Sequence, residues 1–155
     1  MRPKPVDMVG AVLVTHAFIA REFIATVEYL LGNADGIVAV SIDANVDVFG
    51  ARARIWRAMK EVDQGDGVLI MTDLFGGSPS NIAFSFLVTQ NVEVITGVNL
   101  PMILTFCTRR SGVGLRELAK AVLLSGTRSI ARAKDLMEPS GASKTNTPVP
   151  ETRSK

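Results

Sequence analysis

The sequence predicts an α/β fold in which helices cover both faces of a mainly parallel sheet. Short continuous apolar runs, typical of strands buried on both faces, recur along the chain. Segments with helical periodicity separate these runs, which is the pattern of a parallel sheet with crossover helices. The 155 residues suit one domain, and the 47% hydrophobic and 21% charged residues suit a globular one. We therefore expect a doubly wound domain of three layers, α/β/α.

Two strand–helix pairs are expected in the first half of the chain. The first strand is the apolar run 8–14, and the second is the run 37–42. A helix is expected over residues 17–31, where apolar side chains recur at helical spacing and Gly32 is a typical stop. Its apolar face is Phe23, Ile24, Val27, Leu30 and Leu31. The second helix has the apolar stripe Val48, Ile55, Met59 and Val62.

The second half of the chain continues the alternation. Strands are expected over 67–72 and 92–98, separated by a helix over 79–88. That helix is expected to face inward with Ile82, Ala83, Phe86 and Leu87. Two more helices are expected over the apolar segments 101–110 and 115–124. The weak alternation of 127–134 suggests a last strand at the edge of the sheet.

The ends of the chain and its composition exclude several classes of protein. We expect one domain over 8–137, an extension over 1–7, and a disordered tail over 138–155, which is rich in Pro, Ser and Thr. The N-terminus has no secretory signal, and no apolar run is long enough to insert into a membrane. The net charge of +2 is too small to indicate nucleic acid. With Cys107 as the single cysteine, which we expect in the core, the sequence suits the cytoplasm.

The one histidine of the chain, His16, follows the first strand. In sheets of this class ligands bind beyond the carboxyl ends of strands, where the strand order reverses. For the common strand order 2-1-3-4, the first and third strands are neighbours, and the third ends at Asp73. We therefore expect the imidazole and the carboxylate to face each other across one crevice.

This pairing has a chemical use. A neutral histidine is a nucleophile when one ring nitrogen is free, and a carboxylate on the other N–H fixes the tautomer and orients the ring. The alternative is a structural histidine, but the two strand ends favour the functional interpretation. A single histidine and a distant single cysteine do not make a metal site, and nothing indicates a cofactor.

The segment "GGSPSN" supplies the third part of the predicted site. We interpret Ser78 as an N-cap followed by Pro79 at the first helical position. Gly76 and Gly77 allow a tight turn and close approach to a ligand, and the helix start suits an anion. A structural turn is the alternative. No Gly-Lys-Ser/Thr follows, so this is not a P-loop, and Ser78 lacks the Gly-x-Ser-x-Gly elbow of a hydrolase. Together the three parts suggest a phosphorylated histidine.

Three segments resemble the IIA domain of the mannose-type sugar phosphotransferase system. They are "VLVTHAFIAREFIATVEYLLG", "GVLIMTDLFGGSPSNIAFSFL" and "VEVITGVNLPMILTF", and the likeness extends over residues 8–137. The Thr-His, the Asp-x-x-Gly-Gly-Ser-Pro and the Gly-Val-Asn-x-Pro motifs follow one another in the order of that family. The set is specific, although each motif alone is weak.

The resemblance implies a phosphotransferase with a phosphohistidine intermediate. It implies that His16 takes a phosphoryl group from the phosphocarrier protein HPr and passes it to a IIB protein during sugar uptake. It implies that Asp73 bonds the other ring nitrogen, and that Gly76, Gly77 and Ser78 receive the phosphoryl oxygens. It also implies a homodimer that exchanges its last strand, here near 127–134.

The sequence departs from that family at a few positions. Phe75, which we expect at the pocket rim with Thr15, replaces a Trp that some relatives carry, and Ala17 replaces a Gly that many carry. No IIB domain follows residue 155, so we expect the IIB acceptor to be a separate chain. Two alternatives stay open: a regulatory IIA protein that controls a partner without sugar transport, and a phosphotransferase subunit of dihydroxyacetone kinase.

Overall fold

A four-stranded parallel sheet forms the centre of the molecule. The computed structural model describes residues 8–43, 45–88 and 91–137. The strands are β1 (Gly10–His16), β2 (Ile37–Ile42), β3 (Val68–Thr72) and β4 (Val92–Thr96). Every neighbouring pair is parallel, and the strand order is β2-β1-β3-β4. This confirms the predicted α/β class and the 2-1-3-4 order.

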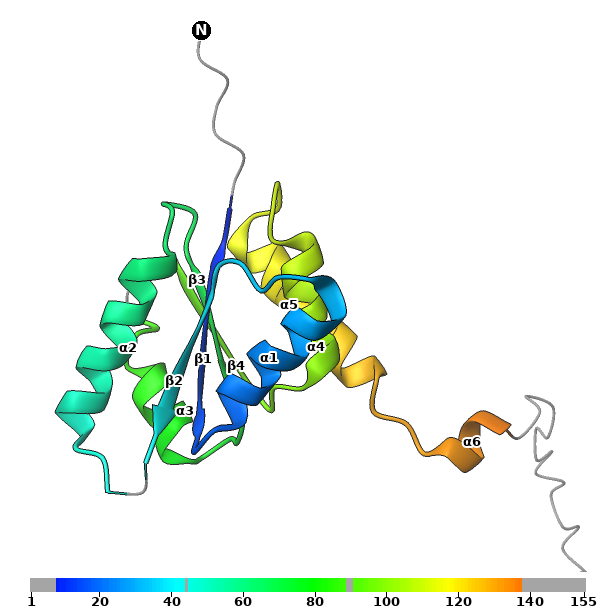
Figure 1. The fold of residues 1–155 in the computed structure, drawn as a ribbon, viewed down its shortest axis with the longest axis horizontal. Coiled ribbons are helices and arrows are strands. Elements are labelled where there is room, and N and C mark those ends of the chain that lie inside the picture. Colours follow the sequence, from blue (N-terminus) through cyan, green and yellow to red (C-terminus); the bar gives the residue numbers. More distant parts are fainter. Residues whose placement is uncertain (1–7, 44, 89–90, 138–155) are drawn as a thin grey trace, which may run out of the picture.

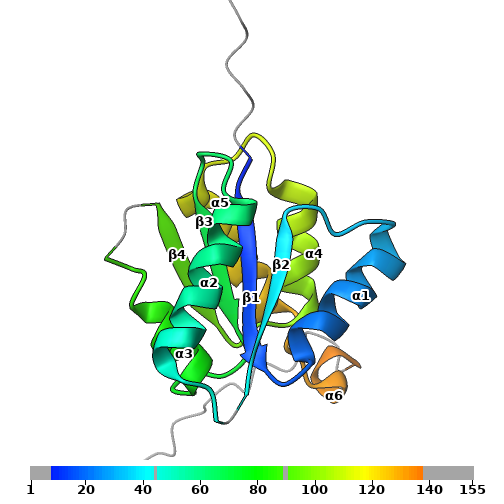
Figure 2. The ribbon, with the colours of Figure 1, turned by 60° about the vertical axis from the view of Figure 1, so that its left-hand side comes forward.

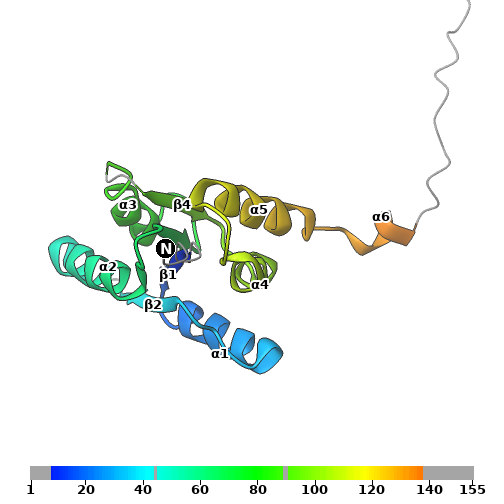
Figure 3. The same ribbon diagram turned by 90° about the horizontal axis from the view of Figure 1, so that it is seen from above.

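Helices cover both faces of the sheet, which confirms the three-layer arrangement. They are α1 (Ile19–Leu31), α2 (Val48–Val62), α3 (Ser78–Phe84), α4 (Leu100–Arg109), α5 (Leu115–Arg128) and α6 (Ala133–Met137). Seen from above, α2 and α3 lie on one side of the strands, and α1, α4 and α5 on the other (Figure 3). The strands end at the lower edge of the sheet in Figure 1, where α1, α2 and α3 begin.

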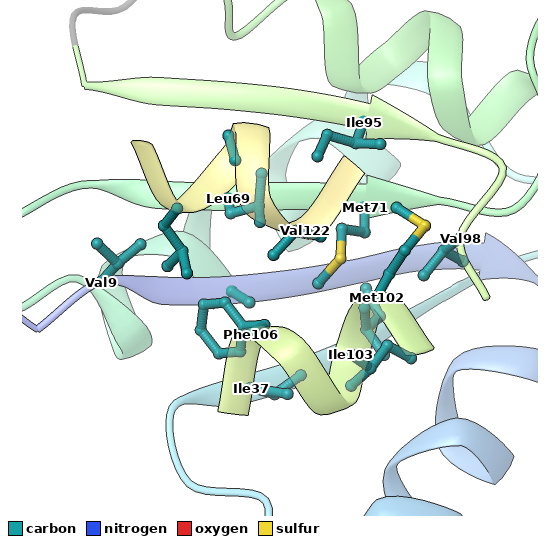
Figure 4. Close-up of a cluster of buried hydrophobic side chains, with 14 of the residues drawn as sticks. Val9, Ile37, Leu69, Met71, Ile95, Val98, Met102, Ile103, Phe106 and Val122 are labelled. Atoms are coloured by element: carbon teal, nitrogen blue, oxygen red, sulfur yellow. The ribbon is translucent and has the colours of Figure 1, made fainter. Parts of the chain in front are cut away.

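Alternation along each strand divides the buried side chains into two cores. Ala11 and Leu13 of β1 point into the core under α1, α4 and α5, whereas Val12 and Val14 point into the core under α2 and α3. Both sets are fully buried. Figure 4 shows the first core, where Met102 and Phe106 of α4 pack on the strands. Because β1 is buried on both faces, its sequence is a continuous apolar run.

The predicted helical faces are correct at their centres and wrong at their ends. Val27 and Phe86 are buried as expected, but Leu30, Leu31, Val48 and Leu87 are 41–60% exposed. The sheet has only four strands, and β2 and β4 are its edges. A helix over an edge strand meets the sheet along a narrow stripe, so the apolar residues beside that stripe stay in contact with solvent.

The predicted edge strand over 127–134 is wrong for the single chain. Helix α5 continues to Arg128, a short loop follows, and α6 begins at Ala133. In this stretch Ile130 is the one large apolar side chain, so a strand there would bury little. In Figures 1 and 3 α6 stands away from the body of the molecule. Strand exchange needs a second chain and stays a prediction.

Other predictions concern the cysteine and the chain ends. Cys107 is half-buried rather than fully in the core, and burial raises the pKa of its thiol, which does not favour a reactive thiolate. The predicted extension 1–7 and tail 138–155 lie outside the described residues. No helix among 8–43, 45–88 and 91–137 is long and apolar enough to cross a membrane.

Candidate functional site

His16 and Asp73 meet at the carboxyl edge of the sheet. His16 is the last residue of β1, and Asp73 follows the last residue of the neighbouring strand β3. Oδ2 of Asp73 lies 2.9 Å from Nδ1 of the His16 ring and also accepts the His16 backbone N–H at 2.9 Å. One carboxylate oxygen therefore fixes both the backbone and the ring of His16.

The Asp73 carboxylate makes few other contacts. Its side chain is 12% exposed, and its second oxygen, Oδ1, is buried without a hydrogen-bond partner among the described residues. The negative charge is therefore directed mainly at His16. A carboxylate on Nδ1 favours the tautomer with a proton on Nδ1, which leaves a lone pair on Nε2.

The other side of the imidazole is open. The His16 side chain is 42% exposed, so an incoming group can reach it. Gly77 lies beside the ring near Cε1: a Cβ added there would be 2.9 Å from Cε1 and 3.4 Å from Nε2 of His16. Residue 77 must therefore lack a side chain for the ring to keep this position. The close approach to a ligand stays a prediction; what Gly77 approaches here is the His16 ring.

The two glycines of the loop are required for different structural reasons. Gly76 has a φ of +81°, a conformation that only glycine adopts readily, whereas Gly77 has a φ of −77°. Gly77, and not Ser78, is the N-cap of α3, so the predicted cap was placed one residue too late. Glycine and serine both suit an N-cap, and proline is tolerated at the second helical position as well as the first. Ser78 is the first residue of the helix and is exposed.

Two residues that the sequence reasoning missed hold this loop. The hydroxyl of the fully buried Ser80 donates to the Gly77 carbonyl at 2.9 Å, and the Asn81 amide donates to the Gly76 carbonyl at 3.4 Å. A serine three residues after a turn commonly donates a hydrogen bond back to the backbone, so the position of Ser80 in the sequence could have indicated its role.

Thr15 supports the site from within and does not lie at its rim. It is fully buried, and its hydroxyl accepts the backbone N–H of Ala20 in the first turn of α1 at 2.9 Å. This hydrogen bond ties the start of α1 to the end of β1 and so steadies the turn that follows His16. Phe75, which is predicted at the rim, is 74% exposed and contacts Phe84, with ring centroids 6.2 Å apart.

The turn after His16 contains backbone strain. Ala17 has a φ of 45°, in the left-handed region that costs an L-residue roughly 1–2 kcal/mol. Ala17→Gly should therefore raise the free energy of unfolding by about 0.5–1 kcal/mol, the strain relieved less the extra entropy of glycine in the unfolded chain. Urea denaturation measures this.

The matched control is Ala25→Gly, at an exposed position within α1. There the same change should lower stability by roughly 0.5–1 kcal/mol, because glycine weakens a helix interior. Equal destabilisation by both changes would show that the turn at Ala17 is not strained.

The Gly-Val-Asn-x-Pro motif organises the fold near the site. Asn99 is the N-cap of α4: its side-chain oxygen accepts the Met102 N–H at 3.2 Å, and its amide donates to the Gly126 carbonyl of α5 at 3.2 Å. The motif therefore joins two helices and contacts neither His16 nor Asp73 by hydrogen bonds. Among the described residues no cluster of three or more His, Cys, Asp or Glu side chains suits a metal ion.

A family model matches most of the domain. The model described as "PTS system fructose IIA component" matches residues 10–123, which include His16, Asp73 and the loop to Ser78. The match begins with β1 and ends within α5.

Several individual proteins are similar to this chain over different shares of its length. The fructose-specific EIIA component of Bacillus subtilis is 29% identical over 90 residues, which cover 57% of this chain and 62% of the relative. The mannose-specific EIIAB component of Escherichia coli is 27% identical over 128 residues, 81% of this chain and 40% of the relative. The chain thus spans less than two-thirds of either relative. The EIIA structure from Streptococcus agalactiae has the same fold, with a TM-score of 0.75, 20% identity, and coverage of 83% of this chain and 99% of that one.

Proposed function

The chain belongs to the mannose-type family of phosphotransferase-system IIA components, and from this we propose that it is a phosphocarrier with His16 as the phosphorylated residue. In this proposal His16 accepts a phosphoryl group from a phosphocarrier protein of the HPr type and passes it to a IIB partner in sugar uptake. The reaction takes place in the cytoplasm. The observation that carries the proposal is the hydrogen bond between Nδ1 of His16 and Asp73, at a ring that is otherwise open.

The geometry supports transfer through Nε2. The Nε2 lone pair attacks the phosphorus of the phosphorylated donor, the donor's bond to phosphorus breaks, and the N–P bond to His16 forms. The proton on Nδ1 stays in place, so the ring gains positive charge as the bond forms. Asp73 stabilises that charge and holds the ring in line. Transfer to the acceptor reverses these steps.

The loop beside the ring is suited to receive the phosphoryl oxygens. The Ser78 hydroxyl is exposed at the first position of α3, so it can donate to an anion. The backbone at Gly76 and Gly77 has no side chains that would keep the oxygens away. Helix α3 has only seven residues, so its dipole contributes little, and the proposal depends on the short-range donors.

Gly77→Val should slow phosphoryl transfer by about 100-fold or more. A side chain there collides with Cε1 of His16, and a displacement of about 1 Å at a reacting group can cost that much. The initial rate of His16 phosphorylation measures the effect. The matched control is Gly114→Val, at another N-cap with negative φ and nothing within 4 Å, where the rate should not change. Equal rates for both variants would remove Gly77 from the site.

We further propose that the protein is a homodimer assembled through its C-terminal segment. Ile130, Leu136 and Met137 are 75–84% exposed in the single chain, and α6 projects from the body of the molecule (Figure 1). Light scattering should give a dimer for the full chain and for a chain ending at Met137. A chain ending at Ser129, which keeps α5 intact, should be a monomer. A monomeric full chain at micromolar concentration would contradict this assembly.

A phosphoryl-transfer assay tests the function. The full chain is incubated with phosphorylated HPr-type donor and then with candidate IIB proteins. We expect one acid-labile phosphoryl group per chain, on His16, that leaves when an acceptor is added. No phosphorylation by any HPr-type donor would overturn the proposal. Phosphorylation without transfer to any IIB protein would indicate the regulatory alternative. The similar proteins are named for fructose and for mannose, so the sugar is left unassigned.

A further inference from the structure

One face of α2 carries aromatic and cationic side chains that the proposed function does not use. Phe49, Arg52, Trp56 and Lys60 lie at spacings that place them on one side of the helix. All four are exposed; the Phe49 side chain is 82% and that of Trp56 43% exposed. Figure 2 shows the beginning of α2 beside α3, which forms the other wall of this surface.

Stacked rings and cations make this face rigid. The Trp56 and Phe86 rings stack with centroids 6.5 Å apart and planes within 8°. The Arg52 guanidinium lies 4.5 Å above the Phe86 ring and also contacts the Ser85 hydroxyl, and the Lys60 ammonium lies 4.5 Å from the Trp56 ring. Each cation is held at the surface by an aromatic ring, which reduces the entropy lost when it binds a partner.

The face is hollowed along its length. A pocket between α2 and α3 shares the lining residue Arg52 with a second hollow, and the second shares Trp56 with a third. From Phe49 to Lys60 the row extends about 17 Å at the helical rise per residue. An elongated groove of this kind fits a segment of a polypeptide better than a small ion. We call this row, from Val48 to Lys60 along α2, the α2 groove.

The charge of the groove is positive. Two cationic side chains, Arg52 and Lys60, line the groove, and the fifteen residues of α2 together hold four cationic side chains and one acidic side chain, Glu61. The residues of α3 that line the groove, Ser78, Asn81, Ile82 and Ser85, carry no charge. Asp63 lines the far end, but its Oδ1 accepts the N–H groups of Gly65 and Gly67.

We propose that the α2 groove binds an acidic segment of a partner protein that also carries a large apolar side chain. Carboxylates of the segment would pair with Arg52 and Lys60, and the apolar side chain would pack against Phe49 and Trp56. Nucleic acid fits less well, since stacking on successive bases needs several free rings, whereas Phe86 is buried and Trp56 is covered by Phe86 and Lys60, which leaves Phe49 alone. The proposal does not depend on phosphorylation of His16.

Trp56 offers a direct measurement, because it is the only tryptophan of the chain. Random linear peptides are selected on the full chain, and the enriched peptides are titrated while Trp56 emission is followed. We expect the enriched peptides to be acidic, to contain a large apolar residue and to change that emission on binding. Their affinity should fall by about tenfold or more for Arg52→Glu/Lys60→Glu and for Phe49→Ala. Lys120→Glu on α5, also exposed, should bind them normally.

Several outcomes would overturn the proposal. The selection could enrich no peptides, or only neutral or basic ones. The enriched peptides could bind the Arg52→Glu/Lys60→Glu variant as tightly as the wild-type chain, or they could leave the Trp56 emission unchanged. Displacement of the peptides by single-stranded RNA at physiological salt would assign the groove to nucleic acid. Loss of self-association in Phe49→Ala would assign it to a second copy of the chain. His16→Ala should bind the peptides normally, which separates this proposal from the proposed function.

Discussion

His16→Ala should accept no phosphoryl group from a phosphorylated HPr-type donor. The chain has no other histidine, so no second imidazole can replace the nucleophile. The expected loss is complete and not a reduced rate, because the bond to phosphorus forms at the removed atom. Incorporation of label under conditions that saturate the wild-type chain measures it.

Stability and binding controls separate the missing nucleophile from a damaged fold. His16 lies at the end of β1 and is 42% exposed, so its removal opens little of either core. Thermal unfolding of the variant should resemble that of the wild type. The variant should also still bind the donor protein, since the surrounding surface is unchanged. Label on a folded His16→Ala chain would show that another residue is the nucleophile.

The meeting of His16 and Asp73 was predictable because it follows from topology. Both residues come directly after apolar runs, and parallel neighbours end at the same edge of a sheet. Once β1 and β3 are neighbours, the register places Thr72 opposite Val14, which puts Asp73 close to His16. Local patterns of apolar residues therefore determine this contact, although the residues are far apart in the sequence.

The details of the loop were not predictable, because several residues suit each position. Gly77 and Ser78 both make acceptable N-caps, and only the fold shows that the His16 ring leaves no room for a side chain at residue 77. Likewise, Thr15 could be assigned to the rim until the buried hydrogen bond to Ala20 was seen. Such roles depend on the angle between β1 and α1, which the apolar pattern does not specify.

The error at 127–134 has another physical cause. Alternation of apolar residues is weak evidence for a strand when only Ile130 is a large apolar side chain. A strand also needs a neighbouring strand with free hydrogen-bonding groups. In the single chain only the first two residues of the segment belong to α5, a short loop follows, and the last two residues begin α6. The exposed outer residues of α2 were equally hidden from pattern analysis, since an aromatic stripe at helical spacing reads as core.

Asp73→Asn should slow phosphoryl transfer by roughly ten- to ten-thousand-fold, the range spanned by general base and tautomer-orienting roles. The amide oxygen is expected to keep the place of Oδ2, because the His16 backbone N–H still needs an acceptor there. The ring would then keep its orientation but lose the negative charge that stabilises it as the N–P bond forms. The amide nitrogen would take the position of Oδ1, which is buried without a partner, at a cost of about 1–3 kcal/mol in stability.

The matched control is Asp47→Asn, which removes the same charge near the same edge of the sheet. Asp47 is the N-cap of α2 and accepts the Gly50 N–H at 2.9 Å, a role that asparagine fills equally well. If negative charge acting over a long range sets the rate of phosphoryl transfer, Asp73→Asn and Asp47→Asn should slow transfer equally. If the negative charge in contact with Nδ1 sets it, only Asp73→Asn should slow transfer, measured well below its melting temperature. Near-normal transfer by a folded Asp73→Asn chain would mean that Asp73 holds the His16 backbone and takes no part in the chemistry.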